Sequence, residues 1–199
     1  MRKRIFDLFF ATLGLIFAFP VFLMIAFAIK WDSKGGVFFK HKRVGQHGVP
    51  FFMYKFRTMV DNAAAIGPGV TCHEDSRITR VGHVLRGSKL DELPQLINVW
   101  KGEMDLVGPR PEVAKYVRYY TPEQQQVLTA KPGITGPAQI AWRNEAFKIR
   151  NAQNIDAFYI QHIMPQKLAL DLKYVQTPAS VLRDLHYILS TFKALLPTV

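Results

Sequence analysis

The sequence of 199 residues contains one cysteine, Cys72, so no disulfide can form within the chain. Its six histidines show no His-x-x-x-His or Cys/His pattern, and we therefore expect no zinc site. Acidic residues are also scarce, 15 against 26 Lys and Arg, which gives a formal net charge of +11. The low cysteine content fits a reducing compartment.

The positive charge is concentrated early in the chain, where residues 1–60 hold ten Lys and Arg against Asp7 and Asp32. This imbalance predicts an anionic partner. Nucleic acid, anionic lipid and phosphorylated small molecules all meet that condition by charge alone. The aromatic residues, however, lie mainly in an apolar segment and at expected core positions, so we expect no nucleic-acid partner.

An uncharged apolar run is the strongest single feature of the sequence. Leu8 to Ile29 are 22 consecutive residues without a charge, and a membrane helix needs about 20. A cleaved signal peptide is one alternative, because basic residues precede the run and residues 26–28 (AFA) resemble a cleavage site. The run is nevertheless longer than the roughly 7–15 apolar residues of a signal peptide.

The flanks of this run and one proline inside it bear on its membrane topology. Basic residues lie on both sides, from Arg2 to Arg4 and again from Lys30 onward, and such residues are retained on the cytoplasmic side. Pro20 lacks an amide hydrogen and predicts a break in the helix. A re-entrant helix that enters and leaves the same leaflet fits both observations better than a straight transmembrane helix, which stays the alternative.

Strand and helix patterns alternate along the rest of the chain. Residues 37–39 and 49–54 predict two short strands joined by a turn at residues 45–48, with Lys55 and Arg57 following on one face. A helix is expected over residues 111–129. From Val181 to Leu196, apolar residues at helical spacing predict an amphipathic helix that packs on the core or lies in the membrane interface.

Residues 85–112 read LRGSKLDELPQLINVWKGEMDLVGPRPE and gather acidic, basic and turn-forming residues in one window. Ser88, three residues before Asp91, is a helix-start pattern, so we expect a helix to begin there and to end near Gly102. Asp91 and Glu92 would then lie in the first turn, where the helix dipole favours anions.

The charged residues of this window suit phosphate chemistry. Arg86 and Arg110 lie near the acidic pair in sequence, and Arg can bind a phosphoryl group through two hydrogen bonds. Carboxylates such as Asp91 and Glu92 can hold a divalent cation or attack phosphorus. The window is therefore our candidate catalytic centre, while ordinary helix capping is the alternative explanation of the acidic pair.

Several ordered motifs extend this interpretation. They are residues 54–59 (YKFRTM), Arg86 with 90–96 (LDELPQL) and Asn98, Lys101-Gly102, 107–111 (VGPRP), 131–136 (KPGITG) and Arg143-Asn144. Through these motifs the chain resembles the bacterial sugar transferase family, the monotopic phosphoglycosyl transferases that begin the assembly of lipid-linked glycans. The resemblance covers effectively the whole chain.

The resemblance implies an activity. Such enzymes transfer a sugar 1-phosphate from a UDP-sugar to a polyprenyl phosphate such as undecaprenyl phosphate, with Mg²⁺ as cofactor. It implies that Asp91 attacks the β-phosphorus to form a phosphosugar-aspartyl intermediate and release UMP. Glu92 would position Mg²⁺ with Asp91 or accept a proton. The same resemblance implies that Lys55, Arg86 and Arg110 neutralise phosphoryl oxygens and that Arg143 contacts the nucleotide.

The resemblance also implies an architecture. We expect an α+β fold, with a re-entrant membrane helix over residues 1–34 and a small, mainly helical catalytic domain over residues 35–199 that carries a β-hairpin and amphipathic interfacial helices. The domain would lie on the cytoplasmic face of the bacterial inner membrane, in exopolysaccharide or glycoconjugate biosynthesis, and a homodimer is compatible with the sequence. A non-catalytic membrane scaffold of a glycan-assembly complex is the alternative function.

Overall fold

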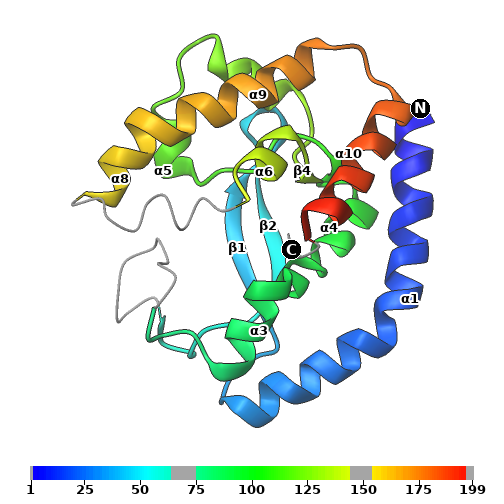
Figure 1. The fold of residues 1–199 in the computed structure, drawn as a ribbon, viewed down its shortest axis with the longest axis vertical. Coiled ribbons are helices and arrows are strands. Elements are labelled where there is room, and N and C mark those ends of the chain that lie inside the picture. Colours follow the sequence, from blue (N-terminus) through cyan, green and yellow to red (C-terminus); the bar gives the residue numbers. More distant parts are fainter. Residues whose placement is uncertain (1, 64–74, 144–153, 196–199) are drawn as a thin grey trace.

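A computed structural model describes residues 2–63, 75–143 and 154–195. The first helix, α1 (Arg2–Asp32), is long and apolar enough to cross a membrane, as expected from the uncharged run. Figure 1 shows that α1 changes direction along its length, and Pro20 is the proline inside it. A proline removes one hydrogen bond of the helix, which is a sufficient physical cause for such a bend.

After α1 the chain forms an antiparallel hairpin, β1 (Phe38–Val44) and β2 (Pro50–Phe56), in the middle of the fold (Figure 1). The predicted hairpin is confirmed, with longer strands than the sequence pattern indicated. The two strands are joined by a 3-10 turn, Gln46–Gly48, and their register places Phe39 opposite Lys55. Gly48 has a φ of 78°, a value that favours glycine.

Two short helices follow the hairpin, α3 (Arg80–Ser88) and α4 (Gln95–Lys101), with a 3-10 turn at Leu90–Glu92 between them. The helix start predicted at Ser88 is wrong. Ser88 ends α3, and its Oγ donates a hydrogen bond to the Val84 carbonyl at 2.8 Å. The cap of α3 is Thr79, and the predicted stop at Gly102 is confirmed by its φ of 85°.

A small parallel pair, β3 (Asp105–Val107) and β4 (Gly133–Thr135), lies beside α4. The long helix predicted between them is wrong, because the structure has only α5 (Ala114–Val117) and a 3-10 segment (Gln124–Thr129). Pro122 interrupts the region, and the residue before a proline avoids helical geometry.

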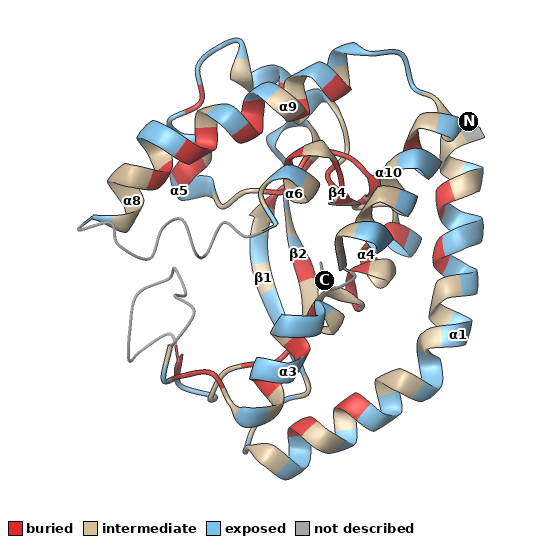
Figure 2. Ribbon diagram, viewed as in Figure 1, coloured by how far each residue is buried: buried red, intermediate tan, exposed pale blue. Residues whose placement is uncertain are grey.

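The remaining elements are α6 (Pro137–Ala141), α8 (Ile155–Phe158), a π-helical turn (Tyr159–Ile163), α9 (Met164–Gln176) and α10 (Val181–Leu195). The amphipathic helix predicted at the end of the chain is α10. Buried residues occur in α6, the π-helical turn, α9 and α10 (Figure 2). The fold is thus a mixture of helix and strand, with one long apolar helix at its start.

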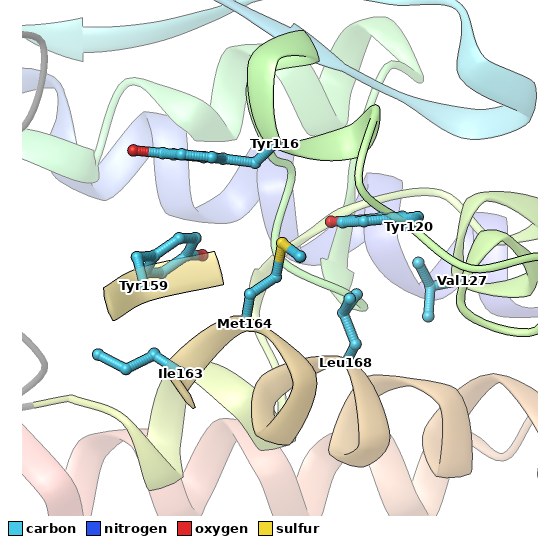
Figure 3. Close-up of a cluster of buried hydrophobic side chains, with 7 residues drawn as sticks. All are labelled: Tyr116, Tyr120, Val127, Tyr159, Ile163, Met164 and Leu168. Carbon is cyan, nitrogen blue, oxygen red and sulfur yellow. The ribbon is translucent and has the colours of Figure 1, made fainter. Parts of the chain in front are cut away.

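Three apolar clusters hold these elements together. The first joins α5 and the 3-10 segment to α9 (Figure 3); it contains Tyr116, Tyr120, Val127, Tyr159, Ile163, Met164 and Leu168. In the second, Ala11 of α1 packs near Met53 and Val99, and in the third Ile25 and Ile29 of α1 are buried. Both halves of α1 therefore belong to the core, although most of its apolar surface is exposed.

Candidate active site

The acidic pair lies on the 3-10 turn between α3 and α4. The chain enters this turn through Lys89, whose φ of 60° is in the left-handed region. On α4, Asn98 ties the turn region to the hairpin, because its Oδ1 accepts a hydrogen bond from the Tyr54 amide at 3.0 Å and its Nδ2 donates to the Phe52 carbonyl at 2.7 Å. This buried amide brings β2 beside the acidic pair.

Two cations meet at Glu92. The Lys55 ammonium donates to Glu92 Oε1 at 2.7 Å, and Arg110 Nη2 donates to the same oxygen at 3.0 Å. Lys55 also lies 3.7 Å from Asp91 Oδ2. Residues distant in sequence, on β2, the 3-10 turn and the loop after β3, thus form one charged cluster, as expected for Lys55, Asp91, Glu92 and Arg110.

The two neighbouring carboxylates differ in electrostatic state. Burial favours the neutral form of Glu92, but the charges of Lys55 and Arg110 hold its pKa well below the usual range. Burial raises the pKa of Asp91, opposed by the charge of Lys55. Asp91 forms no hydrogen bond within the part of the chain that the structure describes. Glu92 is therefore a fixed anion, whereas the Asp91 oxygens are available for reaction with an electrophile.

Two further arginines near the hairpin, Arg86 and Arg57, donate hydrogen bonds to different parts of the chain. Arg86, near the end of α3, donates from Nε to Thr58 Oγ1 at 2.8 Å, and its charge lowers the pKa of Asp91. Arg57, two residues after Lys55, donates to the carbonyls of Ser33 and Lys34. Arg57 thus joins the end of α1 to the hairpin, whereas Arg86 is a further cation near the acidic pair.

Arg143 is not in contact with this cluster. It lies beyond α6, exposed, and has no hydrogen bond or ion pair to any residue of known position in the structure. Residues 144–153, which follow it, lie outside the described residues. A contact between Arg143 and the nucleotide stays a prediction.

Asp171 on α9 is a site residue that the spacing of the central window could not indicate. Its Oδ2 accepts a hydrogen bond from the Arg110 amide at 3.3 Å, and its Oδ1 accepts one from the Ala138 amide at 3.4 Å. Asp171 therefore links the Arg110 loop to α6. The sequence feature that could have indicated Asp171 is its place on the same helical face as Leu168 and Leu172, where an apolar residue is normal.

Burial raises the pKa of Asp171 to about 7, although the two amides and the nearby cations oppose this. An unfolded Asp has a pKa near 4, so the folded state binds the extra proton between about pH 4 and 7 and stability falls as the pH rises through that window. We expect Asp171→Asn to remove this pH-dependent decrease in the free energy of unfolding, which is on the order of a few kcal/mol. Thermal unfolding at pH 5 and pH 8 measures it; an unchanged pH dependence in the variant would contradict the assignment.

The acidic pair is also the candidate metal site. The structure contains no group of three or more potential His, Cys, Asp or Glu ligands among residues 2–63, 75–143 and 154–195. Mg²⁺ is commonly held by one or two carboxylates together with water and substrate phosphates. Asp91 and Glu92 are two carboxylates of this kind, and a magnesium ion held by them stays a prediction.

Comparisons with known proteins agree with this chemistry. A family model described as bacterial sugar transferase matches residues 1–198. The UDP-glucose:undecaprenyl-phosphate glucose-1-phosphate transferase of Caulobacter vibrioides is 38% identical, over 100% of this chain and 71% of the relative. The exopolysaccharide production protein ExoY of Sinorhizobium fredii is 37% identical over 81% of this chain and 78% of its own length. The undecaprenyl-phosphate galactose phosphotransferase of Salmonella typhimurium is 39% identical, over 72% of this chain and 33% of the relative.

Proposed function

Because the chain belongs to the bacterial sugar transferase family, we propose that it transfers a sugar 1-phosphate from a UDP-sugar to undecaprenyl phosphate. Relatives that carry this activity in their names align with most of the chain. The observation that supports this function best is the cluster in which Lys55 and Arg110 meet Glu92 beside Asp91. The chain is therefore a transferase of glycan assembly.

Asp91 is the nucleophile in the proposed mechanism. One carboxylate oxygen attacks the β-phosphorus of the UDP-sugar, the bond from that phosphorus to the bridging oxygen breaks, and UMP leaves with the electron pair. A phosphate oxygen of undecaprenyl phosphate then attacks the same phosphorus and displaces the Asp91 carboxylate. Covalent catalysis of this kind divides one difficult transfer into two easier steps.

The cations around Asp91 stabilise the charge that moves during transfer. Lys55 and Arg110 are held by Glu92, and Arg86 by Thr58, so their positions are set before substrate binds. Preorganised positive charge is the main contribution that a protein makes to phosphoryl transfer. Asp91 and Glu92 would hold Mg²⁺, which when bound would neutralise diphosphate oxygens.

We further propose that α1 is re-entrant and that the domain lies on the cytoplasmic face of the bacterial inner membrane. Support comes from the bend in α1 (Figure 1) and from the exposed apolar side chains of α10, Leu182, Leu185, Leu189 and Phe192, which would face lipid. A cysteine placed before Arg2 should resist an impermeant thiol reagent added outside intact cells. Labelling from outside would show that the helix spans the membrane.

The transfer is tested by measuring UMP release from a panel of UDP-sugars. The purified protein in lipid nanodiscs receives Mg²⁺ and undecaprenyl phosphate, and undecaprenol, which lacks the phosphate, serves as the control acceptor. We expect multiple turnovers with at least one UDP-sugar and only with the phosphorylated acceptor. A folded protein that releases no UMP from any of these donors would contradict the proposal and favour the scaffold alternative.

A further inference from the structure

A charged cavity lies apart from the acidic pair. Its volume is about 360 Å³, and it is bounded by the first turn of α1, by β3, and by the end of α9 and the start of α10. In Figure 1 the N-terminal end of α1 is at the top of the molecule and α3, which leads to the acidic pair, is at the bottom. No residue of the candidate active site lines this cavity.

Four cations line the cavity, and one of them, Lys3, lies close to three carboxylates. The Lys3 ammonium lies 2.5 Å from Asp184 Oδ2, 3.6 Å from Asp7 Oδ2 and 3.7 Å from Asp105 Oδ2. The other three, Arg4, Lys131 and Arg183, have no carboxylate partner among the residues the structure describes. With all groups ionised, four cations and three carboxylates leave one net positive charge.

Arg4 and Arg183 are held in place by neutral acceptors. Arg4 donates to the carbonyls of Val99 and Trp100 at 2.6 and 2.9 Å, at the end of α4. Arg183 lies 4.1 Å above the centre of the Tyr174 ring and donates to the Thr177 carbonyl at 3.2 Å. These contacts fix both guanidinium groups without neutralising them by a carboxylate.

Two donors at the cavity are still without an acceptor. Arg183 Nε is buried and has no hydrogen-bond partner within the described chain, and the half-buried Lys131 ammonium has neither a hydrogen bond nor an ion pair there. A buried donor without an acceptor is costly and uncommon in native proteins. An anion in the cavity would supply an acceptor to the Lys131 ammonium and would lie beside the Arg183 side chain, which lines the same cavity.

We propose that this cavity binds a phosphate group, presented either by a phospholipid head group or by free phosphate. A guanidinium matches phosphate through parallel hydrogen bonds, and an ammonium adds a point charge. The single net positive charge suits a phosphate ester of low charge. The cavity opens beside the first turn of α1, the helix that would enter the membrane, where lipid head groups are abundant.

Binding is measured on the full chain in detergent, without a UDP-sugar, so that the result does not depend on turnover. The probe is fluorescent phosphatidylglycerol, and diacylglycerol with the same label is the comparison that lacks phosphate. We expect Lys131→Gln with Arg183→Gln to bind phosphatidylglycerol at least about tenfold more weakly than wild type, because two charge-assisted hydrogen bonds are lost. Lys173→Gln with Lys193→Gln, which removes the same charge from exposed positions of α9 and α10, should bind normally.

The source of the phosphate follows from competition. Displacement of the lipid by millimolar inorganic phosphate would assign the site to free phosphate, and resistance to displacement would assign it to lipid. Wild-type affinity in the double variant would overturn the proposal, as would equal affinity for diacylglycerol. If the double variant does not fold, the single variant Lys131→Gln tests the proposal, because Lys131 has no hydrogen bond or ion pair to lose within the described chain. This single variant should bind phosphatidylglycerol severalfold more weakly than wild type, and Lys131→Arg should restore binding.

Discussion

Replacing Asp91 with asparagine should reduce UMP release by about 10⁴-fold or more. The amide is close to isosteric with the carboxylate but does not attack phosphorus. Asp91 forms no hydrogen bond within the described residues, and burial already disfavours its charge by raising its pKa. The variant should therefore fold as stably as wild type, so that thermal unfolding separates lost chemistry from lost structure.

A covalent intermediate gives this prediction a second readout. Wild-type protein given a UDP-sugar with radioactive β-phosphate, and no acceptor, should retain label that hydroxylamine releases, as expected for an acyl phosphate. Asp91→Asn should retain none. Glu123→Gln is the matched control, because it removes an exposed carboxylate that lies outside the charged cluster and leaves the nucleophile. Labelled protein in the Asp91→Asn variant would assign the nucleophile to another residue.

The second large effect is expected at Lys55. Lys55→Gln removes the ammonium that lies 2.7 Å from Glu92 and 3.7 Å from Asp91, and we expect kcat/KM for transfer to fall by about 10²- to 10³-fold. Glu92 keeps Arg110 as a partner, so the turn should hold its position. Initial rates at several UDP-sugar concentrations would separate kcat from KM.

Lys42→Gln is the control for this experiment. Lys42 is exposed on the same hairpin, so its loss changes the net charge equally without reaching the acidic pair. Its kcat/KM should stay within about twofold of wild type, since exposed charges contribute little. Equal losses in both variants would show that overall charge, rather than the position of Lys55, controls the rate.

The sequence predicted features that depend on local patterns. The apolar run predicted a long helix, which is α1, and the strand pattern predicted the hairpin. Gly102 ends α4 as expected. The predicted helix start at Ser88 was wrong because the end of α3 and the start of the next helical turn lie only two residues apart there. A Ser-x-x-Asp pattern indicates a cap, but the Ser88 hydroxyl can equally bond back to the preceding turn, and tertiary packing decided in favour of the second arrangement.

Contacts between distant segments could not be predicted from spacing. Asp171 reaches Arg110 across 61 positions of the sequence, and no local pattern connects them. The sequence motifs predicted Lys55, Arg110 and Glu92 as site residues, and the three side chains do lie together. Arg143, predicted from the same resemblance, stays exposed and apart from them.

The way α1 packs has a consequence for how the protein is made and engineered. Lys3 contacts Asp184, 181 positions later, and α1 also supplies buried residues beside the hairpin. The helix α1 is thus not a detachable module: a chimaera that exchanges it for a foreign apolar helix would lose part of the protein's interior. During synthesis α1 leaves the ribosome long before α10, so the Lys3 ammonium has no Asp184 carboxylate to contact until the end of the chain is made.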